Sequence, residues 1–505
     1  MPRRSSLFIY TLISTIIISV KAHNLDQQIP LVLSNHSHPR PSWSSPPVSN
    51  PTKSFWTDTP NANPLAHEGS TGPLGFGGED VDVCVIGSGI TGISAVYHLH
   101  RYLEAQGSGG VERKVVVLEA REFCSGATGR NGGHLTRNPF SGYAAREHNY
   151  GKENAKKTYR LEDYVSSSIA DIVHSHGLVD TVDLVKGDHI TLFFTEEEEK
   201  RALQDYKDAK EGGVDLDGVK FLDRTTMFET YGANYSGVFF PSYNLWPLKF
   251  VSGLHNITSS TESFLKLKLH TLTPVTSIDS ALPSNSASKH TKWIVTTPRG
   301  ALTCKNIIHA TNAYAPYLLP QFQDRIIPTR GQIIALRAKT SLDRLQRLSW
   351  QANLGYEYWF PRPEEKSEDG ECKPPLVILG GGRDTAGPGL DQYTVDDSVL
   401  NGRVSKTLRE FLPDLFACTG MFEEGREPEM EWTGIMGFTP NGAPIVGPIE
   451  GLEGQYIAAG FTGHGMPRAF AAAEAVAGMI TSKMTGTEWE APEWLPEHYL
   501  TTWEY

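Results

Sequence analysis

Cysteine is scarce in this sequence and follows no metal-binding pattern. Five cysteines occur among 505 residues, with no Cys-x-x-Cys pair and no cysteine and histidine spacing typical of zinc ligands. So small and odd a number excludes a disulfide-stapled scaffold, and we predict no metal site. Cys84 lies inside an apolar run, so we interpret it as a small buried hydrophobic residue rather than a disulfide partner.

Positive charge is also in short supply. The 46 lysines and arginines are outnumbered by 58 acidic residues, the net charge is -12, and no run rich in basic residues occurs. Because binding a phosphate backbone depends on a surplus of lysine and arginine, we predict that nucleic acid is not a partner. The length is ample for two or three units around deep cores.

The apolar run near the N-terminus is short for a membrane span. Residues 7–20 are apolar, whereas about 20 residues cross a bilayer. Arginines precede the run and Val20-Lys21-Ala22 follows it as a small-residue cleavage pattern. We therefore predict a secretory signal peptide over 1–22 and a secreted protein; the alternative is an uncleaved anchor in the lumenal membrane. Three Asn-x-Ser/Thr triplets fit a secreted glycoprotein, at Asn35, Asn234 and Asn256.

Residues 23–80 are rich in proline, serine and asparagine. Such a composition cannot bury enough apolar surface to fold alone, so we predict a linker or a wrapping arm. Trp43, Phe55 and Trp56 are unusual in a pure linker, which predicts that the segment docks on the globular body.

A strand, a helix and a second strand follow from Val81 onward. VDVCVIG is typical of a buried strand, the stretch from Ile90 has apolar residues at helical spacing, and KVVVLEA is a second buried strand. Between the first strand and the helix lies G-x-G-x-x-G, Gly87 to Gly92, and Glu119 ends the second strand. Glycines there let backbone N–H groups and a helix N-terminus approach a pyrophosphate, so the unit predicts dinucleotide binding.

The stretch Cys124–His134, CSGATGRNGGH, favours a flavin dinucleotide over a nicotinamide one. It follows the second strand directly, where a nicotinamide enzyme would usually begin another helix, and it is glycine-rich and irregular instead. Such a segment can run along an extended cofactor, with backbone amides at Ala127, Thr128, Asn131 and Gly132 directed at it.

Further along the chain, the patterns are mostly structural. Thr195 with Glu198 three residues later is a helix-start signature, so the acidic run there is not a ligand cluster. Residues 292–310 and 376–379 are strand-like, and 404–412 and 467–482 are helical.

Seven segments in order resemble the D-amino-acid-oxidase-like superfamily of FAD-dependent oxidoreductases, which includes glycine and sarcosine oxidases. They are SFWTDTPNANPLAHEGSTGPL, DVCVIGSGITG, VVVLEAREFCSGATGRNGGH, IIHATNAYAPYLLP, IIPTRGQ, TGIMGFTPNGAPIVG and GFTGHGM. The chain looks closest to the branch of gamma-glutamylputrescine oxidase and its fungal relatives. The resemblance implies an α/β fold with a Rossmann-like FAD-binding domain on a parallel sheet and a smaller, mixed-sheet α+β substrate domain. We assign 81–182, 245–325 and 426–485 to the first, 183–244 and 326–425 to the second, and 486–505 to a C-terminal tail.

The resemblance also implies which residues bind FAD. The glycine turn takes the pyrophosphate, Glu119 the ribose, the glycine-rich segment the body of the cofactor, and the C-terminal segment the flavin ring. The cofactor-binding residues so assigned are Gly87, Ser88, Gly89, Ile90, Thr91, Gly92, Glu119, Ala120, Arg121, Ser125, Gly126, Ala127, Thr128, Arg130, Asn131, Gly132, Gly133, Val275, Thr311, Asn312, Gly463, His464, Gly465 and Met466.

The activity so implied is oxidation of the C–N bond of an amine or N-alkyl amine to an imine. Hydride passes to the flavin, and oxygen is the acceptor that gives hydrogen peroxide. The candidate catalytic residues are His464, Tyr356, Tyr358 and Arg330. At strand period the two tyrosines share one face, with Trp359 on the other, and their rings can hold a cationic amine; the alternative is that they are core aromatics. Arg362 and Trp432 are further possible substrate contacts or packing residues.

Departures from the family pattern leave alternatives open. No cysteine stands where some sarcosine oxidases attach FAD, and His134 does not match a covalent histidine, so we expect noncovalent FAD. Residues 376–379 are wholly apolar where those oxidases carry a lysine that activates oxygen. The basic residues that sarcosine oxidases use near this point for a substrate carboxylate are also missing from 124–134, which favours amines over amino acids. A dehydrogenase or tailoring oxidase of specialised metabolism that does not use oxygen, and an inactive secreted binding protein, are the alternatives.

Overall fold

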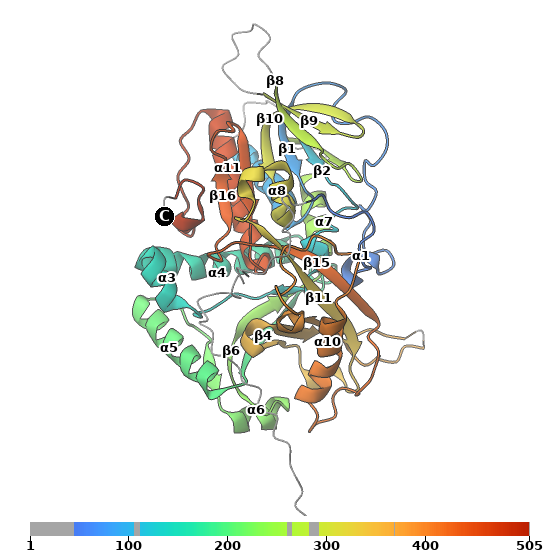
Figure 1. Ribbon diagram of the computed structural model, residues 1–505, viewed down its shortest axis with the longest axis vertical. Helices are drawn as coiled ribbons and strands as arrows, with labels where there is room; N and C mark the ends of the chain where they lie inside the picture. Colours follow the sequence, from blue (N-terminus) through green and yellow to red (C-terminus); the bar gives the residue numbers. More distant parts are fainter. Residues whose placement is uncertain (1–44, 106–111, 260–264, 282–291, 368, 504–505) are drawn as a thin grey trace, which may run out of the picture.

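Two β-sheets organise the chain, one above the other in the long direction of the molecule (Figure 1). The computed structural model describes residues 45–105, 112–259, 265–281, 292–367 and 369–503. The predicted signal peptide, the Asn35 site and Trp43 lie outside these residues.

The upper sheet is built around five parallel strands in the order β7-β2-β1-β10-β17. The first strand is buried along its whole length, which is typical of a parallel sheet covered on both faces. An antiparallel strand extends one edge and an antiparallel pair extends β10. The strands are β1 (Val81–Ile86), β2 (Arg113–Leu118), β7 (Leu265–His270), β8 (Ser277–Ala281), β9 (Lys292–Thr297), β10 (Gly300–His309), β16 (Ile445–Pro448) and β17 (Gln455–Ala459).

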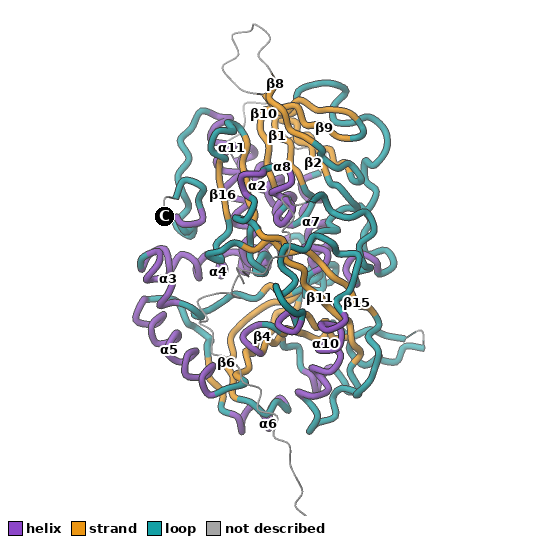
Figure 2. Tube along the Cα trace, in the orientation of Figure 1, coloured by secondary structure: helices purple, strands orange, loops and turns teal. Residues whose placement is uncertain are grey.

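Four long helices pack with the upper sheet, and two of them lie close together (Figure 2). Small side chains such as Ala471 and Ala473 are fully buried in the common core, which lets the helix backbones approach each other. The helices are α2 (Ile90–Ala105), α4 (Lys152–Ser175), α7 (Pro247–Thr258) and α11 (Met466–Thr485), of which α2 and α11 are the close pair.

The lower sheet is mixed, in the order β15-β11-β14-β13-β12-β4-β6-β3 with β5 paired to β6. Its strands are β3 (His134–Leu135), β4 (Val185–Phe193), β5 (Lys220–Leu222), β6 (Ser236–Asn244), β11 (Ile327–Arg337), β12 (Ser349–Ala352), β13 (Glu357–Pro361), β14 (Leu376–Gly381) and β15 (Met430–Phe438). The remaining helices are α1 (Phe55–Asp58), α3 (Tyr143–Tyr150), α5 (Glu196–Gly212), α6 (Arg224–Tyr231), α8 (Ala315–Leu318), α9 (Leu342–Leu345) and α10 (Gly402–Leu415). The Rossmann-like parallel unit and the mixed second sheet are those predicted.

Two strands of the lower sheet come from parts of the chain that the sequence analysis assigns to the FAD-binding domain. They are β15 and β3, and β3 begins at His134, the last residue of the glycine-rich stretch. The glycine-rich stretch is thus tied to both sheets.

The last described residues pack on the body, since Leu500 bridges to Val446 and Tyr499 is buried.

The N-terminal arm docks on the body as its aromatic residues predict. Phe55 and Trp56 form the short helix α1, capped by Ser54, and both side chains are buried against Trp246. At a more distant predicted helix start, Thr195 accepts a hydrogen bond from the Glu198 N–H at 3.2 Å. Both local predictions are confirmed.

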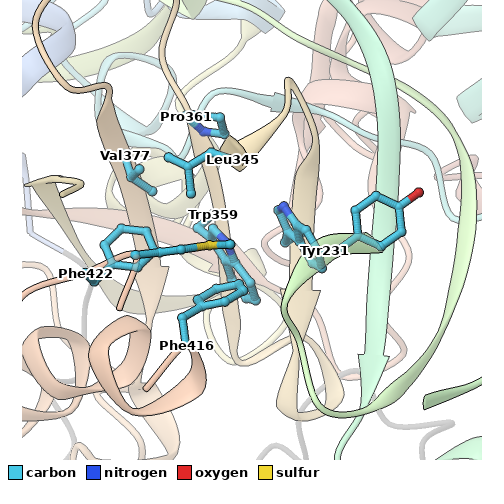
Figure 3. Close-up of a pocket in the computed structure, with 9 residues that line it drawn as sticks. Tyr231, Leu345, Trp359, Pro361, Val377, Phe416 and Phe422 are labelled. Carbon is cyan, nitrogen blue, oxygen red and sulfur yellow. The ribbon is translucent and has the colours of Figure 1, made fainter. Parts of the chain in front are cut away.

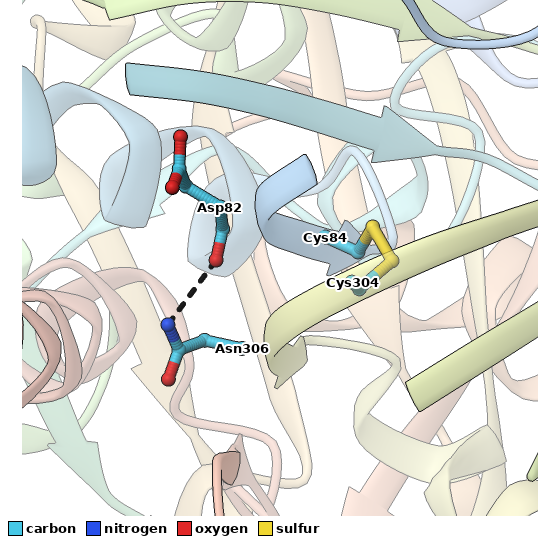
Figure 4. The surroundings of a disulfide bond; sticks show 4 residues. All are labelled: Asp82, Cys84, Cys304 and Asn306. Atoms are coloured by element: carbon cyan, nitrogen blue, oxygen red, sulfur yellow. Dashed lines mark hydrogen bonds between the residues drawn. A yellow bond between two sulfur atoms is a disulfide. The ribbon is translucent and has the colours of Figure 1, made fainter. Parts of the chain in front are cut away.

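The prediction for Cys84 is wrong, because Cys84 forms a disulfide with Cys304 (Figure 4). The two residues lie on the adjacent parallel strands β1 and β10, with their Cα atoms 5.9 Å apart. They are 220 residues apart in sequence, so no spacing pattern revealed that the strands are neighbours. Cys124 is buried and free, and Cys372 and Cys418 are exposed and free.

Candidate active site

The first glycine turn joins β1 to α2 with almost no space between backbones. A Cβ atom at Gly92 would collide with the carbonyl oxygen of Gly87, so only glycine lets the first turn of α2 pack on the strand end. That first turn contains no acidic side chain. Its N–H groups and positive helix end therefore suit an anionic group such as a pyrophosphate.

Glu119 lies at the C-terminal end of β2, beside this turn. One carboxylate oxygen accepts hydrogen bonds from the Ser88 N–H at 3.0 Å and the Ser88 hydroxyl at 2.8 Å, and the other accepts from the Arg121 N–H at 3.0 Å. The carboxylate is held at the position that the sequence assigns to a ribose hydroxyl.

The glycine-rich segment 124–134 links the first turn to the lower sheet. The Thr128 hydroxyl accepts from the Ile90 N–H at 3.1 Å, which fixes the segment against the start of α2. At its other end a Cβ atom on Gly132 would overlap the ring of Tyr358 on β13. The close approach to Tyr358 requires glycine at position 132, and it brings the tyrosine to the end of the predicted cofactor path.

Two arginines that the sequence assigns to the cofactor are engaged by a carboxylate the sequence did not single out. Arg121 donates to both oxygens of Asp397 at 2.9 and 3.1 Å, and Arg130 Nε lies 3.5 Å from the same carboxylate. Arg130 also donates to the carbonyl oxygens of Ser125 and Thr433. Asp397 lies in the loop before α10, so its contacts with both arginines fix the glycine-rich segment against that loop. Asp397 has no local sequence signal, because it lies far from both arginines in the chain.

The N-terminal arm is clamped to the same segment. Ser54 donates from its hydroxyl to the Gly129 carbonyl at 2.6 Å, and Trp56 donates from its indole to the Asn131 carbonyl. Trp432, considered above as a substrate contact, is fully buried and donates to the Arg130 carbonyl at 3.0 Å. These three side chains hold backbone carbonyls and so occupy none of the segment's N–H groups, of which those of Cys124, Ser125, Gly129 and Gly133 already donate within the protein.

Unsatisfied hydroxyls mark the space between these segments. The hydroxyl oxygens of Ser125, Thr311 and Tyr314 are buried and have no hydrogen-bond partner within the described residues. Asn312 accepts from the Gly460 N–H at 2.8 Å, which joins the end of β10 to the chain after β17. Because buried polar groups are normally paired, such a run of hydroxyls fits a long polar ligand such as FAD. Val275, assigned to the adenine, is buried in the core beneath β8 and β9.

His464 stands at the start of α11 and contacts a buried acid. Its Nε2 lies 3.0 Å from Glu162 on α4, and Arg468 donates to the other oxygen of Glu162 at 2.8 Å. Burial raises the cost of the Glu162 charge, but His464, Arg468 and the Asn138 N–H outweigh it and hold the pKa at about 2. Glu162 is therefore ionised at neutral pH and orients His464.

A group of aromatic side chains on the lower sheet lies next to the glycine-rich segment. The His134 ring centroid is 5.4 Å from that of Tyr358, 5.2 Å from Phe360 and 6.1 Å from His189. Burial lowers the pKa of His134 to about 4 and raises that of Tyr358 to about 12. The rings therefore present an uncharged surface at neutral pH.

The structure does not bring all of the other candidate substrate-contact residues predicted from the sequence next to the glycine-rich segment. Tyr356 precedes β13, which begins at Glu357, so the strand period that placed it on one face with Tyr358 does not apply. Arg330 donates to Asp391 at 3.1 Å and to the Asp396 carbonyl, so its guanidinium group braces a loop. Arg362 pairs with Asp183 and lies over the rings of Phe55, Trp56 and Trp246. Each of the two guanidinium groups is thus paired with a carboxylate of the protein.

A buried acid lies one residue before Tyr358. Glu357 is 1% exposed, and one carboxyl oxygen accepts from the Gly382 N–H at 3.2 Å while the other has no partner within the described residues. Burial, with a smaller effect from Asp384, raises its pKa to about 8. Glu357 is therefore neutral through most of the physiological range.

We expect Glu357→Gln to stabilise the protein at alkaline pH. A folded-state pKa of about 8, above the ordinary 4.5, means that the parent loses stability as pH rises between these values, and the neutral amide avoids this loss. The variant should gain on the order of 4 kcal/mol over the parent at pH 8 and little at pH 4. Thermal melts across this pH range measure the difference, and the exposed Glu371→Gln is the control. A pH-independent difference would contradict the raised pKa.

A small cavity in the lower sheet is not the functional site (Figure 3). Its volume is about 10 Å³, and it lies between β12, β13, β14 and the segment that follows α10, on the opposite face from Tyr358. The lining residues are Tyr231, Leu345, Trp350, Trp359, Pro361, Val377, Phe416, Met421 and Phe422. So small an apolar space is a packing gap.

Comparison with known proteins agrees with this geometry. Residues 82–479 match the model of a family described as FAD dependent oxidoreductase. A probable oxidoreductase OrdL of Rhizobium meliloti is 22% identical over 398 residues, 78% of this chain and 81% of the relative. The gamma-glutamylputrescine oxidoreductase of Escherichia coli is 24% identical over 275 residues, 50% of this chain and 54% of the relative. The crystal structure of glycine oxidase from Geobacillus kaustophilus has a TM-score of 0.59 at 18% identity, covering 84% of this chain and 99% of that one. This chain therefore belongs to the FAD-dependent oxidoreductase family of D-amino-acid-oxidase-like enzymes.

Proposed function

We propose that this enzyme oxidises the C–N bond of a small amine to an imine, with noncovalent FAD as hydride acceptor and oxygen as final acceptor, giving hydrogen peroxide. The observation that carries the proposal is that segment 124–134 contacts the glycine turn through Thr128 and comes near His464 at its other end, His134. His464 is held there by Glu162. Relatives named gamma-glutamylputrescine oxidoreductase and glycine oxidase support a C–N substrate.

Bound FAD would supply the electron acceptor, and the protein's own side chains would prepare the amine. An ammonium group must lose a proton before its lone pair can stabilise the developing imine. Because Glu162 is ionised, His464 Nε2 donates to it, which fixes the orientation of the imidazole ring and leaves Nδ1 as the ring nitrogen that Glu162 does not engage. The uncharged rings of Tyr358 and Phe360 would exclude water from the same space and contact a cationic amine.

A flavin dehydrogenase that does not use oxygen is the second candidate. β14 is buried along its whole length and carries only apolar residues and glycine. No lysine is therefore available on this strand to activate oxygen. An inactive binding protein is disfavoured by the intact glycine segments at both ends of the cofactor path.

Peroxide release on a panel of amines tests the activity. Purified enzyme should release hydrogen peroxide in step with amine consumed, and acid precipitation should leave FAD in the supernatant. Amine oxidation without peroxide would favour the dehydrogenase, and flavin in the pellet would contradict noncovalent binding. A yellow protein inert toward every amine would contradict the substrate class.

We also propose that the protein passes through the secretory pathway and is glycosylated. Asn234 and Asn256 are exposed, as acceptor sites must be, and a buried disulfide joins β1 to β10. Within the described residues no helix is both long enough and apolar enough to span a bilayer. Localisation of the tagged protein, with glycosidase treatment, tests the route.

Thiol counting tests the Cys84–Cys304 disulfide, which supports the proposed secretory route. Titration of the unfolded, unreduced protein should find three thiols, those of Cys124, Cys372 and Cys418, and reduction should raise the number to five. Five thiols before reduction would contradict the Cys84–Cys304 bond and remove its support for an oxidising compartment.

A further inference from the structure

The C-terminal tail, residues 486–503, leaves the end of α11 and runs back beside this helix toward α3 and α4 (Figure 1). The family model matches residues 82–479, so the tail lies beyond the matched part of the chain. It is rich in aromatic side chains, and those of His498 and Tyr499 are only 3% and 2% exposed. Because a chain end is poorly ordered unless contacts tie it down, these contacts indicate what the tail does.

The tail contacts α4 on both sides of Glu162, the buried acid of the site. Before Glu162, the side-chain oxygen of Asn154 accepts a hydrogen bond from the Glu497 N–H at 2.8 Å. Beyond it, the Trp494 ring stacks on that of Tyr164, with ring centroids 4.8 Å apart. Both contacts lie within about two helical turns of Glu162, so they restrict the movement of this part of α4.

The same tail is fixed to the upper sheet beside the start of α11. The Thr501 N–H donates to the Val446 carbonyl oxygen on β16 at 2.9 Å, which anchors the far end of the tail. Tyr499 lies between this anchor and the contacts with α4. Burial raises the pKa of Tyr499, and Arg468 on α11 and Thr158 on α4 oppose the rise, so the phenol group lies beside both helices.

The surroundings of Glu162 depend on how these two helices are spaced. Glu162 is 1% exposed, and it accepts hydrogen bonds from Arg468 at 2.8 Å and from the Asn138 N–H at 2.6 Å. His464 Nε2 lies 3.0 Å from the same carboxylate. Hydrogen bonds weaken steeply when their geometry is lost, and a buried carboxylate is costly without its donors. A small shift of α4 relative to α11 would therefore change the orientation of His464.

We propose that Tyr499 is a positioning residue of the active site, whose ring packs between α4 and α11 and holds Glu162 where it orients His464. The inference rests on the proposed role of His464 in amine oxidation. Tyr499 acts through these neighbours and not on the substrate itself. The tail is thus part of the machinery that prepares the site.

The first test compares full-length holoenzymes carrying Tyr499→Ala, Tyr499→Phe or Trp489→Ala with the parent. Trp489→Ala is the matched control, because it removes another ring of the tail that packs on α11, at Gly478 in the second half of that helix. With an amine that the parent oxidises, Tyr499→Ala should lower kcat by roughly tenfold or more, change KM less and retain FAD. Tyr499→Phe keeps the ring, so it and Trp489→Ala should retain the parental kcat.

Amide hydrogen exchange at Asn138 gives a second measurement, which needs no substrate. The Asn138 N–H donates to Glu162, so its protection from exchange reports whether that carboxylate is in place. Tyr499→Ala should speed exchange at Asn138 by roughly tenfold or more, while the amides of β1 keep their parental rates. Tyr499→Phe and Trp489→Ala should leave the rates at both places unchanged.

Parental kcat or parental exchange at Asn138 in Tyr499→Ala would overturn the proposal, and so would an equal loss in Tyr499→Phe or Trp489→Ala. Equal acceleration of exchange in β1 would also overturn it, because Tyr499 would then serve the fold alone. If the parent oxidises no amine, the proposed function fails, and the exchange rates still decide the role of Tyr499. If Tyr499→Ala does not fold, Tyr499→Leu is judged by the same measurements.

Discussion

Gly92→Ala is expected to yield a protein with at least 100-fold weaker FAD binding, a loss of about 2.8 kcal/mol. The added methyl group would collide with the Gly87 carbonyl, so the first turn of α2 must move away from the end of β1. That movement displaces the N–H groups proposed to meet the pyrophosphate. Fluorescence titration of the stripped protein with FAD measures the loss.

A second glycine provides the control for this substitution. Gly402 begins α10, has nothing within 4 Å of the position its Cβ would take, and does not need a positive φ. Gly402→Ala should bind FAD like the parent. If Gly92→Ala were to bind FAD with parental affinity, the turn would not be the pyrophosphate site.

Trp56→Ala is expected to destabilise the fold by about 3–5 kcal/mol and to weaken FAD binding as well. Trp56 is fully buried, contacts Trp246, and donates to the Asn131 carbonyl of the glycine-rich segment. Its removal leaves a cavity and also releases one clamp on that segment. Denaturant unfolding gives the first loss, and FAD titration gives the second.

Two further variants separate packing from clamping. Phe416→Ala removes a buried aromatic ring from the core of the lower sheet, in a cluster that contains neither the segment nor an assigned FAD residue, so it should lose stability and keep FAD affinity. Trp56→Phe keeps most of the ring and loses the N–H donor, so it should fold and bind FAD slightly less tightly. Equal FAD affinity in Trp56→Ala and Phe416→Ala would show that the arm plays no part in the site.

The sequence reveals the parts of this site that are local in the chain. The strand, turn and helix around Gly87 and Gly92 are read from spacing within a single unit, and the structure has them as predicted. A helix cap such as Thr195 with Glu198 is equally local. Such features depend on neighbours within a few residues, which a sequence pattern records directly.

The parts that the sequence missed depend on partners far away in the chain. Asp397 meets Arg121 across 276 positions, and Cys304 meets Cys84 across 220. Neither pairing follows from spacing, because it exists only once the strands and loops are assembled.

Anaerobic mixing of the purified enzyme with amines, followed by visible absorbance, tests the central claim most directly. The account predicts a yellow protein whose flavin absorbance is bleached by at least one small amine and recovers when oxygen is admitted. A colourless protein that cannot be loaded with FAD, or a flavin spectrum that no amine bleaches, would contradict it.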